Sequence, residues 1–170
     1  MARLDELDLK ILELLQHNNQ LTSEAISRRI GLSSSAVQRR LKRLRKSKVI
    51  EFEVSAVSPQ AVGRSVSAVV GVKLLRESPE LIRRFKDTVR AMPEIMQCYY
   101  LTGQHDFVLV VTARDTQDYN LFLEQLAERF PHIAHVDTGI VLERIKTGVS
   151  LPLVASRDSI GRAATAHCCA

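Results

Sequence analysis

The amino-acid sequence predicts an α+β protein built from two modules, an all-helical one followed by one that mixes strands and helices. The charge distribution is the first sign of this division. Residues 1–50 hold 11 Lys and Arg against 5 Asp and Glu, whereas the rest holds 13 (24 − 11) against 14 (19 − 5). The second sign is a change of apolar spacing, which is helical before residue 50 and strand-like at several places after it. A basic module joined to a near-neutral one suggests a polyanion binder coupled to something else.

Three helix starts of one kind occur in the first fifty residues. Each has an N-cap side chain preceded by an apolar residue and followed, four positions later, by a second one. The three sets are Leu4, Asp5, Leu9, then Leu21, Thr22, Ile26, then Leu32, Ser33, Val37. An N-cap oxygen satisfies a free backbone N–H, and the apolar pair sets the entry angle of the chain. The pattern predicts helices from about Glu6 to Gln16, from Ser23 to Ile30, and onward from Ser33.

The second and third predicted helices are separated by a very short connection. Only Gly31 and Leu32 lie between Ile30 and the cap at Ser33. Glycine suits the left-handed conformation that ends a helix, so the chain turns tightly there. This is the geometry of a helix-turn-helix, in which the second helix enters the major groove of DNA.

The third predicted helix is strongly basic on its outer surface. Between Arg39 and Lys48 there are seven basic residues and no acidic one, a density that repels itself unless a polyanion neutralises it. Gln38 can pair with adenine and Arg39 with guanine, while the other outward side chains suit bases or phosphates. The predicted DNA-binding residues are Ser34, Ser35, Gln38, Arg39, Arg40, Lys42 and Arg43. The alternative is an ordinary solvated surface helix.

The segment after the third helix alternates apolar and polar residues from Val49 to Val57, which predicts an extended strand or arm. A single helical turn is expected around Pro59–Val62. We therefore expect a helix-turn-helix domain over residues 1–50, a strand linker over 51–64, a second domain over 65–152 and a tail over 153–170.

The second domain has the element order strand, helix, strand, strand, helix, strand. The predicted strands are Val66–Leu75, Ile95–Leu101, Phe107–Ala113 and Ala134–Ile145, and the predicted helices are Pro79–Met92 and Thr116–Phe130. This order is typical of a ferredoxin-like (βαββαβ) domain, whose helices cover one face of an antiparallel sheet. Tyr99, Leu101, Val108 and Val110 make the strands too apolar for the other face to meet water, so a second copy is expected to cover it.

The connection between the second and third strands is the candidate small-molecule site. Gly103 permits a positive φ, and the carboxylate of Asp106 together with exposed backbone groups can hold a small zwitterion. An ordinary hairpin connection is the alternative, and composition alone favours it. The histidines and the three cysteines, Cys98, Cys168 and Cys169, show neither a convincing metal-ligand spacing nor a disulfide framework. No metal and no cofactor are predicted.

No leader-like apolar segment or membrane-length apolar run is visible, so a cytoplasmic protein without membrane association is expected.

Several fragments, in this order and spacing, resemble the Lrp/AsnC (leucine-responsive regulatory protein, feast/famine) family of transcriptional regulators. They are Leu4-Asp5 with Asp8 and Ile11-Leu12; Gly31-Leu32-Ser33 with Val37, Arg40-Leu41 and Leu44; Val49-Ile50; and Thr102-Gly103 with Asp106-Phe107. The resemblance covers residues 4 to about 152. One departure is Lys48, where the family usually has glycine.

The resemblance implies a winged-type helix-turn-helix domain and an effector domain that forms dimers and often tetramers or octamers. It also implies an amino-acid effector, bound by the loop between the second and third strands with a less certain contribution from the last strand of a neighbouring subunit. Transferred to this sequence, the effector-binding residues are Leu101, Thr102, Gly103, Gln104, His105, Asp106, Asp137 and Thr138.

The function predicted on this basis is sequence-specific regulation of transcription by a nucleoid-associated, non-enzymatic protein whose oligomeric state or DNA affinity responds to a small amino acid. Two alternatives remain open. Certain tetrapyrrole decarboxylases share the two-module fold, although a basic third helix argues against an enzyme. A low-specificity nucleoid protein would differ only in its ratio of specific to non-specific affinity.

Overall fold

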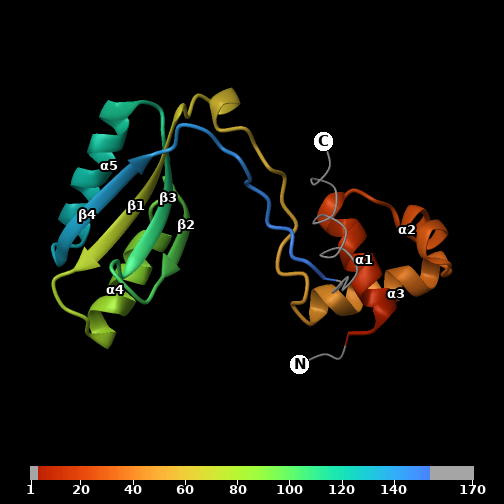
Figure 1. Cartoon of the computed structure of the whole chain (residues 1–170). Coiled ribbons are helices and arrows are strands. Elements are labelled where there is room, and N and C mark those ends of the chain that lie inside the picture. Colours follow the sequence, from red (N-terminus) through yellow and green to blue (C-terminus); the bar gives the residue numbers. More distant parts are fainter. Residues whose placement is uncertain (1–3, 154–170) are drawn as a thin grey trace, which may run out of the picture. The chain divides into compact units, whose positions relative to one another are not determined.

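The computed structural model describes residues 4–153 of the 170-residue chain. These residues form two compact units (Figure 1). The first, here called the helix-turn-helix unit, combines residues 4–55 with residues 146–153, and the second, the effector unit, is Ala56–Ile145. The two predicted modules are therefore present, but the first also takes in a short stretch from beyond the second.

The helix-turn-helix unit contains α1 (Glu6–His17), α2 (Ser23–Ile30) and α3 (Ser34–Lys46). All three predicted N-caps are formed. Asp8 N–H donates to Asp5 Oδ1 (2.8 Å), Ala25 N–H to Thr22 Oγ1 (3.2 Å) and Ala36 N–H to Ser33 Oγ (3.2 Å). The buried apolar core consists of Ile11, Leu12, Ile26, Val37, Leu41 and Leu44. No strand is assigned within residues 4–55, so these residues form no wing.

The C-terminal end of α3 requires a left-handed residue, and that residue is Lys48, with a φ of 57°. Lys48 N–H donates to Arg45 O (3.2 Å) and Val49 N–H donates to Leu44 O (3.0 Å). This pair of bonds is the Schellman motif, which glycine adopts at lower cost than any other residue. The family's preference for glycine at this position thus has a conformational reason.

The effector unit begins with a 3₁₀ turn, η1 (Gln60–Val62), and continues through a βαββαβ sequence. Its elements are β1 (Val66–Leu74), α4 (Pro79–Arg90), β2 (Ile95–Tyr100), β3 (Phe107–Ala113), α5 (Thr116–Arg129) and β4 (Ile133–Ile140). All paired strands are antiparallel, in the order β2-β3-β1-β4. The predicted ferredoxin-like domain is confirmed.

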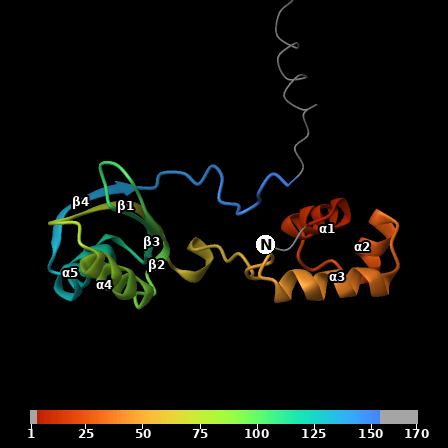
Figure 2. The ribbon, with the colours of Figure 1, turned by 90° about the horizontal axis from the view of Figure 1, so that it is seen from below.

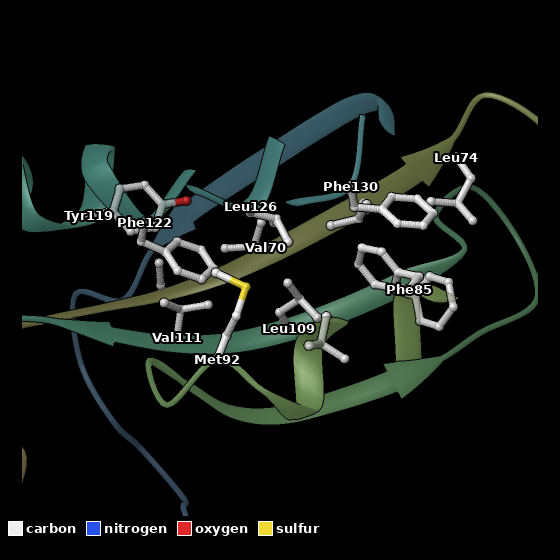
Figure 3. Close-up of a cluster of buried hydrophobic side chains, with 14 of the residues drawn as sticks. Val70, Leu74, Phe85, Met92, Leu109, Val111, Tyr119, Phe122, Leu126 and Phe130 are labelled. Carbon is white, nitrogen blue, oxygen red and sulfur yellow. The ribbon is translucent and has the colours of Figure 1, made fainter. Parts of the chain in front are cut away.

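Both helices of the effector unit lie on the same side of the sheet (Figure 2). Alternate residues of the central strands point into the core beneath these helices, among them Val70 on β1 and Leu109 on β3 (Figure 3). Phe85 on α4 lies at the centre of an aromatic group, with its ring 4.4 Å from that of Phe107 and 5.1 Å from that of Phe130. The opposite side of the sheet, here called the open face, carries neither α4 nor α5, the two helices of this unit.

Two predicted strands differ from the structure by more than one residue. The last strand ends at Ile140 rather than Ile145, because Val141 N–H makes its bond to Ser67 O (2.8 Å), the second residue of β1, and only Val66 of β1 lies beyond it. The alternating segment Val49–Val57 is assigned no strand, since the described part of a single chain offers it no neighbouring strand.

No helix among residues 4–153 is both long enough and apolar enough to cross a lipid bilayer.

Candidate functional site

The outward side of α3 presents four of the predicted DNA-binding residues in one strip. Val37, Leu41 and Leu44 are buried against the core, which turns Ser35, Gln38, Arg39 and Lys42 outward, and all four are exposed. The fifth, Ser34, is half-buried in the first turn. Because α2 ends at the left-handed Gly31 (φ 72°) and α3 is capped at Ser33, the N-terminal half of this strip projects directly from the turn.

Arg40 and Arg43 have internal partners on α1. Arg40 Nη1 lies 2.7 Å from Asp5 Oδ2 and 2.8 Å from Asp8 Oδ1, and Arg43 binds the other oxygen of Asp8. The side chain of Asp8 is fully buried, whereas that of Arg43 is about half exposed. The hydrogen bonds that Arg40 donates to Asp5 and then to Asp8 raise the pKa of Arg40, and the bond that Asp5 accepts from Arg40 lowers the pKa of Asp5. Both arginines therefore join α3 to α1, and phosphate contact by them stays a prediction.

The sequence analysis did not identify Asp5 and Asp8 as partners of these arginines. The two carboxylates also form a capping box, because Asp5 N–H donates to Asp8 Oδ2 (3.1 Å) while Asp8 N–H donates to Asp5 Oδ1. An acidic residue of α1 that lies next to the apolar stripe, three positions after a cap, was a usable signal for this double role.

Arg45 of α3 forms a salt bridge with Glu53 of the linker. Its Nε and Nη2 atoms donate to Glu53 Oε2 and Oε1 at 3.0 and 2.8 Å, a bidentate pair. The hydrogen bond with Glu53 raises the pKa of Arg45 and lowers that of Glu53. The linker therefore begins as a segment attached to α3.

The predicted effector loop is a hairpin connection between β2 and β3. Leu101 N–H closes it by donating to Asp106 O (2.8 Å), and Gly103 has a φ of 124°, a conformation suited to glycine. Leu101, Thr102, Gly103 and Gln104 are exposed, His105 is half-buried and Asp106 is buried. The loop thus offers backbone groups and short polar side chains at its tip.

The carboxylate of Asp106 points toward β1 and not toward solvent. It accepts hydrogen bonds from Lys73 Nζ and from Leu74 N–H, both at 2.7 Å, while its own N–H donates to Val72 O (2.9 Å). Burial alone would raise the pKa of Asp106, but the bonds from Lys73 and the Leu74 N–H outweigh it, so the pKa lies below its usual value. The acceptors that a zwitterion's ammonium group would use are already occupied by donors of β1.

His105 lies flat on the open face of the sheet over Gly71. A Cβ placed on Gly71 would be 2.8–2.9 Å from three atoms of the imidazole, so only glycine leaves room for it. His105 Nε2 is 3.4 Å from Asp137 Oδ2, and His135 Nε2 is 2.9 Å from Asp137 Oδ1. The fold therefore brings the loop residue His105 together with Asp137, which pairs with Gly71 across β1 and β4. An isolated glycine in a strand pattern is a known sign of such a close approach.

Thr138 is not brought to the loop within one chain. Its hydroxyl lies 2.7 Å from that of Tyr119 on α5, on the helix-covered side of β4, while Asp137 faces the opposite side. The loop does not line the hollow of about 350 Å³ in the effector unit. That hollow lies near the start of β1, and its lining includes Arg64, Ser67 and Arg144.

No group of three or more His, Cys, Asp or Glu side chains in residues 4–153 is arranged to hold a metal ion. Cys168 and Cys169 lie outside the described residues.

Comparison with known families matches both units. The AsnC-type helix-turn-helix domain matches residues 4–45, and the Lrp/AsnC ligand binding domain matches residues 67–151. Over 150 residues the chain is 44% identical to an uncharacterized HTH-type transcriptional regulator, y4tD, of Sinorhizobium fredii, covering 88% of this chain and 89% of the relative. It is 34% identical to the transcriptional regulator AzlB of Bacillus subtilis, covering 88% and 96%.

Solved structures agree with this assignment. A transcriptional regulator from Neisseria meningitidis in complex with L-Met superposes with a TM-score of 0.82 at 32% identity, covering 89% of this chain and 97% of that one. An AsnC family regulator from Agrobacterium tumefaciens gives a TM-score of 0.83 at 29% identity, covering 88% and 97%. The fold and these matches define a DNA-binding transcriptional regulator with a C-terminal ligand-binding domain. The chain belongs to the Lrp/AsnC family, which confirms the resemblance inferred from its residues.

Proposed function

We propose that this regulator binds a specific duplex site as a dimer or larger oligomer, that the strip on α3 reads the site, and that a small amino acid bound at the Leu101–Asp106 loop changes its DNA affinity or assembly. The observation that carries the proposal is the pairing, in one chain, of a capped recognition helix with exposed Gln38 and Arg39 and a separate loop whose tip is exposed. We further propose that the protein acts on DNA in the cytoplasm and has no enzymatic role.

Oligomerisation is supported by the open face of the sheet. Val69, Met96 and Tyr99 remain 43%, 50% and 52% exposed although they lie on the strands. Covering such a face with a second copy buries apolar area and generates a two-fold pair of α3 helices. Two-fold partners can address half-sites about 34 Å apart, one turn of B-DNA.

The effector proposal is supported by the match to a ligand-binding domain and by the L-Met complex of the related Neisseria protein. L-Met is accordingly the first amino acid to test, within a thermal-shift screen of the proteinogenic set. The amino acid with the largest shift is then added to a DNA-binding assay on the region upstream of the regulator's own gene. Failure of every amino acid to change melting or DNA binding would contradict an amino-acid effector.

Glycine variants localise that response. Gly103→Ala places a Cβ at a φ of 124° in the loop, while Gly63→Ala places one at a φ of 74° in the turn after η1, and neither Cβ would meet another atom within 4 Å. We expect the thermal shift to be lost in Gly103→Ala and kept in Gly63→Ala. Equal losses would indicate general strain rather than a binding loop.

Two substitutions on α3 test whether this helix distinguishes one DNA sequence from another. Gln38→Ala is expected to relax preference at one base position, whereas Lys42→Ala should weaken all sequences evenly and lower the salt slope of log K by about 0.9. Lys42 is a cleaner choice than Arg43, because Arg43 also binds Asp8. A uniform loss from both variants, or no preference over random DNA, would leave a low-specificity nucleoid protein.

A further inference from the structure

The helix-turn-helix unit includes a segment from the far end of the chain. After β4 the chain runs on, and residues 146–153, here called the return segment, belong to the helix-turn-helix unit. The Gln16 side chain on α1 holds this segment with two hydrogen bonds to one residue. Gln16 Nε2 donates to Leu151 O (3.1 Å), and Leu151 N–H donates to Gln16 Oε1 (2.6 Å). Leu153 then packs against the apolar core of the unit.

A primary amide is suited to this contact. It offers one donor and one acceptor side by side, as a neighbouring strand would, and so pairs with both polar groups of a single residue. Glutamate at the same place would keep the acceptor for Leu151 N–H but would set a carboxylate oxygen against Leu151 O. The chemistry of Gln16 is therefore matched to a backbone partner and not merely to solvent.

The return segment gives the two units a second connection, which follows the chain from β4 and ends in the hydrogen bonds between Leu151 and Gln16. The last effector-unit bond is Val141 N–H to Ser67 O, ten residues before Leu151 (151 − 141). Ten residues span at most about 36 Å. The first connection runs from Glu53, bound to Arg45, to Arg64, bound to Thr112, eleven residues later (64 − 53). A unit held by two tethers of similar length has fewer orientations than one held by a single linker.

A continuous set of contacts leads from the return segment to the recognition helix. Gln16 and Asp8 lie on the same helix, α1, and Asp8 binds Arg40 and Arg43 on α3. At the other end, β4 carries Asp137 and ends at Ile140, six residues (146 − 140) before the return segment begins. A displacement of β4 can therefore reach α3 through the return segment, Gln16 and α1.

We propose that Gln16 is a positioning residue that couples β4 to the DNA-binding helix by holding Leu151. The proposal rests on the proposed function, in that the effector acts at or near β4, but the coupling itself is tested without any amino acid. Coupling is reciprocal, so holding α3 on DNA must change β4 as surely as changing β4 alters α3.

The experiment is hydrogen exchange of the full-length protein with and without a 60-base-pair duplex. In the free protein, Gln16→Ala should speed exchange in peptides covering 147–153 about fivefold to tenfold, because one or two modest hydrogen bonds are lost. In the wild type, duplex should slow exchange in peptides covering 133–153 by a similar factor. In Gln16→Ala that response should vanish from 133–140, while DNA affinity stays within about threefold of wild type.

Gln20→Ala is the matched control, since it removes an exposed amide from the same region and should leave the response intact. Gln16→Glu should respond only partly. An undiminished response at 133–140 in Gln16→Ala, or none in the wild type, would overturn the coupling. A merely structural role for Gln16 would lower melting and DNA affinity and leave the response in place.

The hydrogen-exchange experiment can also use a duplex of random sequence, because the experiment requires only that α3 is bound to DNA. Absence of sequence preference or of an amino-acid effect would therefore count against the proposed function alone.

Discussion

The two units of this regulator hold a buried carboxylate in different settings. Among the described residues of the helix-turn-helix unit six apolar side chains are buried, and the fully buried Asp8 of α1 binds two arginines of α3. In the effector unit sixteen hydrophobic side chains are buried, and the buried Asp106 lies at a strand end beside Lys73. A small unit buries too little apolar area to be stabilised by its core alone. In the helix-turn-helix unit, ion pairs and helix caps therefore contribute a larger share of the stability.

The largest expected effect is in the effector core. Phe85→Ala removes the central ring of the aromatic group and should lower the free energy of unfolding of this unit by about 3–5 kcal/mol. All three tyrosines, Tyr99, Tyr100 and Tyr119, belong to this unit and the chain has no tryptophan, so tyrosine fluorescence in a denaturant titration reports it selectively. Leu121→Ala, at a side chain of α5 in the same unit that is 53% exposed, is the control. Comparable losses would mean that the core is not the main source of stability.

The next effect concerns the ionic connection in the helix-turn-helix unit. Asp8→Ala deletes a buried partner of Arg40 and Arg43 and one half of the capping box, which should cost about 2–3 kcal/mol. The readout is hydrogen exchange of the α3 amides. Asp5→Ser keeps a capping oxygen but removes the exposed pair with Arg40, and a smaller loss is expected. Equal losses would show that capping, and not the buried pair, is the important contribution.

A smaller effect is expected at the close approach on the open face. Gly71→Ala forces the His105 ring away from β1 and should cost about 1–2 kcal/mol, measured by tyrosine fluorescence during denaturation. His105→Ala removes the obstacle, so the double variant should be less destabilised than the sum of the two single changes. Strict additivity would mean that the ring is free to leave its place over Gly71 at no cost.

The smallest effect is a gain in stability. Lys48→Gly relieves a side chain held at a φ of 57° and should stabilise the end of α3 by about 0.5–1 kcal/mol, after allowing for the greater freedom of glycine in the unfolded chain. Ser47→Gly, at a φ of −82°, gains no such relief and should be neutral or destabilising. Slower hydrogen exchange near Leu44 in Lys48→Gly alone would support this account.

Local patterns predicted most of the elements because their causes are local. The caps at Asp5, Thr22 and Ser33 act on N–H groups three residues away, and Gly31 acts through its own φ. The end of the last strand was missed, because a strand persists only where a partner is present, and β1 begins at Val66.

The candidate site was less predictable for the same reason. Sequence reasoning placed Arg40 and Asp106 among ligand-contacting groups from their chemistry. Their internal partners, Asp8 and Lys73, are more than thirty residues away in the chain, and no spacing rule connects them.

The sequence by itself determined the two-domain α+β organisation, the helix-turn-helix and its basic outer strip, and membership of the Lrp/AsnC family. The organisation and the basic strip follow from periodicity, caps and charge, which act over a few residues, and the family follows from the order and spacing of short residue fragments that resemble it. Tertiary structure alone decided that Arg40 and Arg43 bind α1, that His105 lies over Gly71 beside Asp137, and that Gln16 holds Leu151. Such contacts depend on where folding brings distant side chains, since hydrogen bonds and ion pairs act only over a few ångströms.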